Sequence, residues 1–289
     1  MESYLNKKNK IKCVCGFDEY FKLFERKDAN HNFEIIKCKN CGLIRTFPVP
    51  DYSEKRYENY GIRRYIKNKK LTVSFMEMIL KEIVRFKKKG RLLEVGCNLG
   101  YFLEIAKNKG FDVGGVELDG RAVNYANNIL GKGVVLQSTL EQANFPNNYF
   151  DIIVASHVLE HLINIPDFLK EIKRILNGWG IIVIASPNFD GLCAKIKKEK
   201  WPGLRPDEHV WQLSKNIIIK FLKEEGFVVI HSETSGLYHN FASVIKDIRD
   251  NMRDKGSFKQ IVYVLLNWFV GKLGMGDNVF IVAANDVKI

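Results

Sequence analysis

The stretch LLEVGCNLGYFL, residues 92–103, decides the fold of this chain. A short apolar run ends at Val95, a turn containing Gly96 and Gly100 follows, and a helical pattern begins at Tyr101. Glycines let a backbone approach a ligand closely, and the first turn of a helix offers free N–H groups. The stretch therefore predicts a strand, a ligand-binding turn and a helix in succession.

The rest of the chain alternates in the same way. The patterns predict strands at 92–95, 113–117, 134–137, 150–155, 180–185, 227–231 and 278–284, and helices at 70–88, 101–108, 121–130, 166–177 and 217–225. Strict alternation indicates an α/β fold whose seven strands form a mostly parallel sheet with helices on both faces. Ligands of such sheets bind at the carboxyl ends of the strands.

Two carboxylates accompany the glycine turn. Glu117 ends the second predicted strand, 17 residues after Gly100, where a carboxylate can accept two hydrogen bonds from a ribose diol. Glu94 precedes the first glycine. Proteins that bind NAD use similar turns, so a domain that binds NAD or no cofactor remains an alternative.

The G-x-x-x-G turn, Glu117 and the fourth-strand segment 150–153 together resemble the class I S-adenosylmethionine (SAM)-dependent methyltransferases, over about residues 68–289. The resemblance implies a Rossmann-like fold in which the turn surrounds the methionine moiety, Glu117 binds the ribose and residues 137–140 meet the adenine. Many members have glycine where this chain has Asn98, but asparagine tolerates left-handed dihedral angles. The expected SAM contacts are Glu94, Gly96, Cys97, Asn98, Gly100, Tyr101, Phe102, Glu117, Leu118, Ser138, Thr139, Leu140, Ser156 and His157.

The fourth strand continues into SHVLEHL, residues 156–162, similar to the "LEH" segment of small-molecule methyltransferases. In those enzymes the end of the fourth strand faces the sulfonium and the acceptor. His157 is therefore a candidate general base, because imidazole exchanges protons near neutral pH. His209 is a second candidate. The alternatives are histidines that only hydrogen-bond the backbone, or a Mg²⁺ site, because some O-methyltransferases have Glu-x-x-Glu-His here. A zinc-protease site is not expected, because HxxEH follows a strand in this chain.

Two stretches break the alternation. Residues 186–213 are expected to form a lid-like loop, which contains His209, and residues 235–276 a helical insertion before the last strand. Both are predicted near the carboxyl edge of the sheet, where a lid belongs.

Four of the six cysteines lie within the first 41 residues, in the pairs Cys13-Val-Cys15 and Cys38-Lys-Asn-Cys41. In a cytosolic chain such clustering indicates metal rather than disulfides. We expect residues 1–60 to form a zinc-ribbon-like module in which the four thiolates bind a structural Zn²⁺. Two reduced pairs without metal are the alternative.

Composition narrows the possible functions. No secretory signal or membrane-spanning run is found in the sequence, so a cytoplasmic protein is expected. The net charge of +12 raises the alternative of an RNA methyltransferase, but the basic residues are spread along the chain. The motifs of nucleic-acid amino and cytosine-C5 methyltransferases, Asn/Asp-Pro-Pro-Tyr and Pro-Cys, are missing. The composition does not indicate an oligomeric state.

The cysteine module and the predicted catalytic domain together resemble bacterial or archaeal zinc-ribbon methyltransferases, several of which act in sugar, polysaccharide or secondary-metabolite pathways. Sugar C-methyltransferases of this style carry a further C-terminal domain, whereas this chain ends at the seventh predicted strand. The resemblance therefore favours O-methylation of a sugar or another hydroxylated small molecule. A scaffold without catalytic activity is a further alternative.

Overall fold

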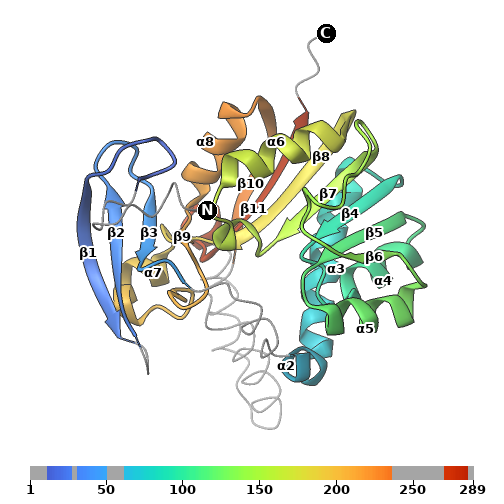
Figure 1. Ribbon diagram of the computed structural model, residues 1–289, viewed down its shortest axis with the longest axis horizontal. Helices are drawn as coiled ribbons and strands as arrows, with labels where there is room; N and C mark the ends of the chain where they lie inside the picture. The colour runs from blue at the N-terminus through green and yellow to red at the C-terminus, as the bar shows by residue number, and fades with distance from the viewer. Residues whose placement is uncertain (1–11, 28–30, 51–61, 236–269, 286–289) are drawn as a thin grey trace.

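The computed structural model describes residues 12–27, 31–50, 62–235 and 270–285, and it contains two β-sheets (Figure 1). All strand pairs of the larger sheet are parallel except those made by β11. Its seven strands confirm the predicted Rossmann-like, mostly parallel α/β fold. Their order across the sheet is β10 (Phe227–Ser235), β11 (Asn278–Asn285), β8 (Leu176–Pro187), β7 (Phe150–Ser156), β4 (Arg91–Val95), β5 (Asp112–Glu117) and β6 (Val135–Gln137).

Helices cover both faces of the central sheet. Neighbouring residues of a strand point to opposite faces, so Leu93 and Ile153 pack with Phe168, whereas Leu92 and Ile152 pack with Phe102. Burial on both faces explains why these strands are continuously apolar in the sequence. One layer is α3 (Lys69–Phe86), α4 (Tyr101–Asn108) and α5 (Gly120–Leu130), and the other is α6 (Ile165–Ile175) and α8 (Lys215–Glu224).

The order of the strands places the ligand-binding edge. β4 lies between β5 and β7, and the chain crosses from one side of β4 to the other. At such a switch point the loops leave the sheet in opposite directions and open a crevice at the carboxyl ends of the strands. The short helix α2 (Ile62–Lys67) and the 3₁₀ turn η2 (Leu159–His161) lie near this edge (Figure 1).

The smaller sheet is antiparallel and contains three strands from the N-terminal region and one from much later in the chain. The order is β1 (Tyr20–Lys27), β2 (Asn32–Cys38), β3 (Ile44–Phe47) and β9 (Trp211–Gln212). β9 pairs with β3 through Ile44 opposite Gln212 and Arg45 opposite Trp211. The N-terminal strands therefore pair with a strand that comes between β8 and α8 in the chain, although β9 is not part of the central sheet.

Segment 186–213 differs from the expected lid-like loop. It contains the end of β8, the helix α7 (Leu192–Lys197), the 3₁₀ turn η3 (Lys198–Lys200) and β9. Trp201 and Leu204 are buried in a cluster with Ile35 of β2. A two-residue strand has no periodicity to detect, which is why the sequence did not indicate this packing.

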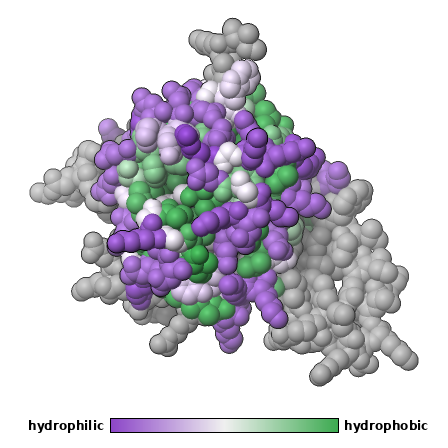
Figure 2. Space-filling model, turned by 90° about the vertical axis from the view of Figure 1, so that its right-hand side faces the viewer, coloured by the Kyte–Doolittle hydropathy of each residue, from purple (hydrophilic) through white to green (hydrophobic). Residues whose placement is uncertain are grey.

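Two predictions fall largely outside the described residues. The helical insertion expected at 235–276 coincides mostly with residues 236–269, and the boundary of the cysteine module coincides with residues 51–61. In the parts of the chain that the structure covers, no helix combines the length and apolarity needed to cross a bilayer. The end of the central sheet at β6 faces the viewer in Figure 2, where hydrophilic side chains surround scattered hydrophobic ones.

Candidate functional site

The glycine turn between β4 and α4 has three residues with left-handed dihedral angles, Gly96, Asn98 and Gly100, at φ 69°, 47° and 73°. The N–H groups of Gly96 and Cys97 donate to the carbonyl of Val116, which ties the turn to β5. A Cβ atom at Gly100 would lie 2.9 Å from the Cβ of an α5 alanine. The prediction that asparagine can replace glycine in this turn is therefore confirmed, and Gly100 has no room for a side chain.

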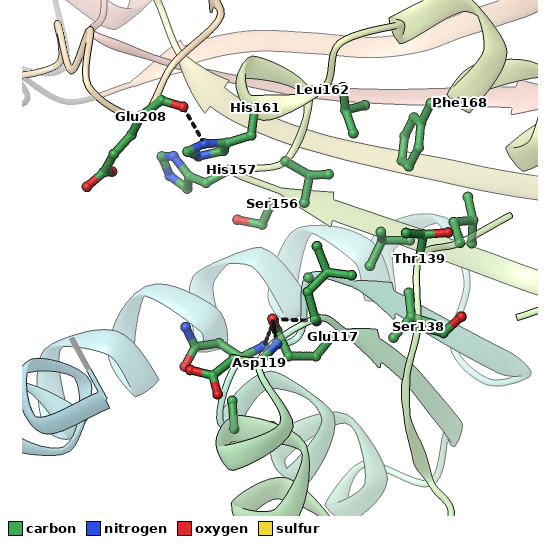
Figure 3. A pocket seen from close by; sticks show the side chains of 18 of the residues that line it. Glu117, Asp119, Ser138, Thr139, Ser156, His157, His161, Leu162, Phe168 and Glu208 are labelled. Atoms are coloured by element: carbon green, nitrogen blue, oxygen red, sulfur yellow. Dashed lines mark hydrogen bonds between the residues drawn. The ribbon is translucent and has the colours of Figure 1, made fainter. Parts of the chain in front are cut away.

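The carboxylate of Glu117 is fixed at the end of β5. It accepts hydrogen bonds from the backbone N–H groups of Asn98 at 2.8 Å, Leu118 at 2.7 Å and Asp119 at 3.0 Å. Two carboxylate oxygens offer about four lone-pair sites, so the group can still accept donors from a ligand. Glu117 lines the cavity at this edge (Figure 3).

Glu94, at the end of β4, is 4% exposed, and its Oε2 atom has no hydrogen-bond partner among the described residues. Burial, and then the charge of Glu117, raise the pKa of Glu94 well above its usual range. The buried Oδ1 atom of Asn98 also lacks a partner in the described chain. Unsatisfied buried acceptors cost about 1–3 kcal/mol each, so a ligand that donates to them gains affinity.

A cavity of about 460 Å³ opens at the carboxyl ends of β4, β5 and β7 and is closed in part by α2. In Figure 3, Glu117 and Asp119 lie on one side of it and His157, His161 and Glu208 on the other. The expected cofactor contacts that line this cavity are Gly96, Asn98, Glu117, Leu118, Ser138, Thr139, Leu140, Ser156 and His157.

The other expected contacts do not line it. Cys97 and Phe102 are buried in the core beneath the sheet, and the Tyr101 hydroxyl lies 3.3 Å from the hydroxyl of Tyr125. Tyr101 and Phe102 lie in the first turn of α4, whose side chains point into the packing with neighbouring helices rather than toward the cavity. Gly100 packs against α5, and Glu94 lies beneath the turn.

His157 follows β7 with the left-handed φ of 57°, which is unusual for a residue other than glycine. Its N–H donates to the carbonyl of Ala185 at 2.8 Å, which holds this conformation. Strained dihedral angles concentrate at functional sites. The side chain lines the cavity, and its Nδ1 lies 3.1 Å from Oε1 of Glu160.

Glu160, the partner of His157, is 1% exposed. Glu160 was not among the catalytic or cofactor-binding residues predicted from the sequence. The Ser186 hydroxyl donates to its Oε2 at 3.1 Å. Burial raises the pKa of Glu160, but the hydrogen bond and charge of His157, with smaller charge effects from other histidines, lower it overall to about 2. An ionised carboxylate only accepts, so neutral His157 has its proton on Nδ1 and a basic lone pair on Nε2.

Two further histidines lie beside this pair. His161 Nδ1 donates to the carbonyl of Glu208 at 2.9 Å, and its ring meets that of His209 edge-on with centroids 4.8 Å apart. His209 is 3% exposed yet lines the cavity. Burial is the largest cause that lowers the pKa of both histidines, which favours their neutral forms.

Several residues at this end of the cavity were not predicted. Arg205 and Glu208 form an ion pair and line the cavity together with Tyr65 of α2. The HxxEH string already pointed to Glu160 and His161. The stretch 201–211 is rich in residue types found at functional sites, but no sequence signal placed Arg205 or Glu208 at this cavity or pointed to Tyr65, because tertiary contacts alone bring them here.

The four N-terminal cysteines come together as predicted. Cys13 and Cys41 have their Sγ atoms 3.5 Å apart, Cys15 and Cys38 have theirs 3.7 Å apart, and all four atoms lie within 4.8 Å of one another. Tetrahedral zinc with Zn–S bonds of about 2.3 Å places sulfurs about 3.8 Å apart. The donor set and spacing fit a closed structural zinc site.

A family model described as "Methyltransferase domain" matches residues 67–232, which is more than half of the chain. The chain belongs to this methyltransferase family. The match begins just before α3 and ends within β10, so it includes the glycine turn, Glu117 and the segment after β7.

Individual relatives agree with the family. A "probable S-adenosylmethionine-dependent methyltransferase" of Mycobacterium tuberculosis is 30% identical over 34% of this chain and 35% of its own length. A sterol 24-C-methyltransferase of Gibberella zeae is 26% identical over 63% of this chain and 52% of its own length. The chain thus spans about a third to a half of these two relatives. A solved SAM-dependent methyltransferase of Thermotoga maritima shares the fold, with a TM-score of 0.55 and 15% identity over 80% of this chain and 99% of that one.

The buried histidines predict a pH dependence of stability. Because burial lowers the pKa of His209, the folded protein binds fewer protons than the unfolded chain. The contribution of His209 to stability is therefore present above about pH 6.5 and is lost as the pH falls through the folded-state pKa. We expect the free energy of unfolding, measured by urea titration, to fall as the pH is lowered from about 7.5 to about 5.5. A full transition would lower it by about 1.4 kcal/mol for each unit by which the folded-state pKa lies below the unfolded-state pKa.

His209→Gln should reduce this fall, whereas the matched change at the exposed His31 should leave it as in the wild type. Both variants keep the cysteines, so any effect of thiol protonation cancels in the comparison. An identical fall in wild type and His209→Gln would contradict the prediction.

Proposed function

We propose that this chain transfers a methyl group from SAM to a hydroxyl oxygen of a sugar or another hydroxylated small molecule. The observation that carries the proposal is that His157, whose Nδ1 pairs with the buried Glu160, lines the same cavity as the glycine turn and Glu117. When bound, SAM would supply the methyl group of its sulfonium. The acceptor oxygen would bond to the methyl carbon while the bond between that carbon and sulfur breaks.

The cofactor half of the cavity suits the groups of SAM. Three of the four lone-pair sites of the Glu117 carboxylate accept backbone N–H groups, and the site left on Oε2 can accept a ribose hydroxyl. The unpartnered Oδ1 of Asn98, which lines the cavity, can accept from the amino group of the methionine moiety. Segment 138–140 lines the wall where the adenine would lie. These residues bind and orient the cofactor, and orientation is a large part of what a displacement reaction needs.

The acceptor half supplies the base. Nε2 of His157 can take the hydroxyl proton, and the buried carboxylate of Glu160 stabilises the imidazolium that results. Glu160 also keeps the ring in the tautomer with Nε2 unprotonated, because its oxygen accepts from Nδ1. General-base catalysis of this kind contributes about 10²- to 10⁴-fold to a rate.

The polar wall favours a hydroxylated acceptor. Arg205, Glu208 and His209 line this end of the cavity, and together they offer donors and acceptors within one small region. Sugar hydroxyls can hydrogen-bond to such groups, whereas an apolar acceptor such as a sterol would displace water from them without offering hydrogen bonds in exchange. This argument supports O-methylation of a polar small molecule, in the cell-surface polysaccharide or secondary pathways that the resemblance implies.

Calorimetric titration of SAM tests the cofactor part of the proposal. We expect wild type to bind SAM and Glu117→Ala to bind it at least about tenfold more weakly, since the variant loses a charge-assisted hydrogen bond to the ribose that is worth about 1.5–3 kcal/mol. Glu104→Ala, a change of a glutamate on α4 that lies outside the cavity, is the matched control and should bind as wild type. No heat with wild type would overturn the cofactor assignment.

The base is tested with radiolabelled methyl transfer to a panel of nucleotide sugars and glycosides. His157→Gln should lower the rate by about 10²- to 10⁴-fold. Its affinity for SAM should stay within about threefold, which is less than 1 kcal/mol. Glu160→Gln should lower the rate less and shift the pH profile, because it changes the environment of the base rather than removing it. A His157→Gln variant with the wild-type rate would rule out this base.

We further propose that Cys13, Cys15, Cys38 and Cys41 bind one structural Zn²⁺ per chain. Elemental analysis of the purified protein should show one zinc per chain, lost in Cys38→Ser and kept in Cys193→Ser. Cys193 lies outside the cluster and serves as the control. Metal-free wild type with all four thiols reduced would contradict the assignment.

A further inference from the structure

One segment of the chain belongs to both the small sheet and the cavity. We call residues 201–212 the acceptor wall segment, because it supplies Arg205, Glu208 and His209 to the end of the cavity opposite Glu117. At its far end, β9 completes the sheet of the cysteine module. The N–H of Val210 donates to the carbonyl of Glu160 at 2.8 Å, so the segment also touches the residue that orients His157.

Arg26 of β1 holds the start of the acceptor wall segment. Its Nη1 donates to the carbonyls of Leu204 at 2.7 Å, Trp201 at 2.9 Å and Glu199 at 3.3 Å. A charged donor shared by several carbonyls gives strong hydrogen bonds and fixes the course of a backbone that has little regular structure. The contact crosses 175 residues of sequence from Arg26 to Trp201.

Thr46 of β3 holds the end of the segment. Its buried hydroxyl donates to the carbonyl of His209 at 2.7 Å and accepts from Nε2 of Gln212 at 3.1 Å, and its N–H donates to the carbonyl of Val210 at 2.9 Å. The guanidinium of Arg45 lies 5.2 Å from the ring of Trp211. Two of these hydrogen bonds thus fix the backbone carbonyls of His209 and Val210, and the third fixes the side chain of Gln212.

The cysteine cluster holds the hairpin that carries Thr46. Cys38 ends β2, its N–H donates to the carbonyl of Leu43 at 2.9 Å, and β3 begins one residue later. Cys13, Cys38 and Leu43 belong to the same buried cluster as Val210 and Trp211. Anything that fixes the four thiols therefore fixes β3 and the acceptor wall segment packed on it. In Figure 1 this sheet lies at the left, whereas β4 and α4, which flank the cofactor turn, lie on the right-hand side.

We propose that the cysteine module is required to form the acceptor site. Its residues Thr46 and Arg26 are positioning residues that hold the acceptor wall segment against the cavity. The term acceptor site rests on the proposed function. The placement of the segment does not, because it follows from hydrogen bonds that form without any substrate. Loss of the metal or of these bonds loosens the acceptor half of the cavity and leaves the cofactor half in place.

Hydrogen exchange of the full chain tests the proposal without any acceptor. The N–H groups of Leu204, Glu208, His209 and Val210 are hydrogen-bonded and should be protected in wild type. Thr46→Val, which retains the metal, and wild type stripped by chelator under reducing conditions should both exchange at least about tenfold faster in residues 204–212. Thr46→Ser should restore protection, and Arg26→Gln replaces Thr46→Val if that variant does not fold.

Thr234→Val is the matched control, because Thr234 is also buried and its hydroxyl donates to a carbonyl, that of Gly271, which does not belong to the acceptor wall segment. It should leave exchange in residues 204–212 unchanged. Exchange of residues 94–104 and the affinity for SAM should stay within about threefold of wild type in every variant. Unchanged protection of residues 204–212 in Thr46→Val and Arg26→Gln would overturn the proposal, as would equal loosening of residues 94–104. Neither hydrogen exchange nor SAM affinity requires methyl transfer. If only the proposed function is wrong, the change in exchange of residues 204–212 is still seen and only the methyl-transfer assay fails.

Discussion

The buried carboxylate of Glu160 connects the parts that build the catalytic edge. Its side chain pairs with His157 after β7 and with Ser186 of β8, and its backbone carbonyl accepts from Val210. A charge taken out of water is tolerated only where hydrogen bonds satisfy it. Glu160 meets that condition through two side chains, and the same two bonds fix the orientation of the imidazole beside the cavity. The position of the base and the position of the acceptor wall segment thus depend on one residue.

Most of the fold follows from patterns of short range. The parallel strands are buried on both faces and are therefore continuously apolar, which marks them in the sequence. The left-handed turn at Gly96, Asn98 and Gly100 uses residues that tolerate positive φ, so the turn and Glu117 are predictable from residue types and spacing. The four cysteines are grouped by spacing alone. Each of these features is determined by residue types and spacings within about 30 residues of sequence.

The features that escaped prediction depend on contacts between distant residues. β9 has two residues and is defined only by its pairing with β3. Arg205 and Glu208 reach the cavity because that pairing carries their segment there. Tyr101 was expected to contact the cofactor, but its direction on α4 is set by packing against α5. Glu160 could have been found, since an ionisable residue beside a candidate base is a natural partner for it.

The pairing of β9 with β3 also affects the order in which the protein can assemble during synthesis. The bond between Thr46 and His209 spans 163 residues, so β1, β2 and β3 leave the ribosome long before their fourth strand exists. Contacts of such sequence separation form late, because a long loop must close first. Until then the edge of β3 is unpaired and can associate with other chains. A cross-link through the four cysteines, which are all present by residue 41, would keep the early hairpin ordered during this interval.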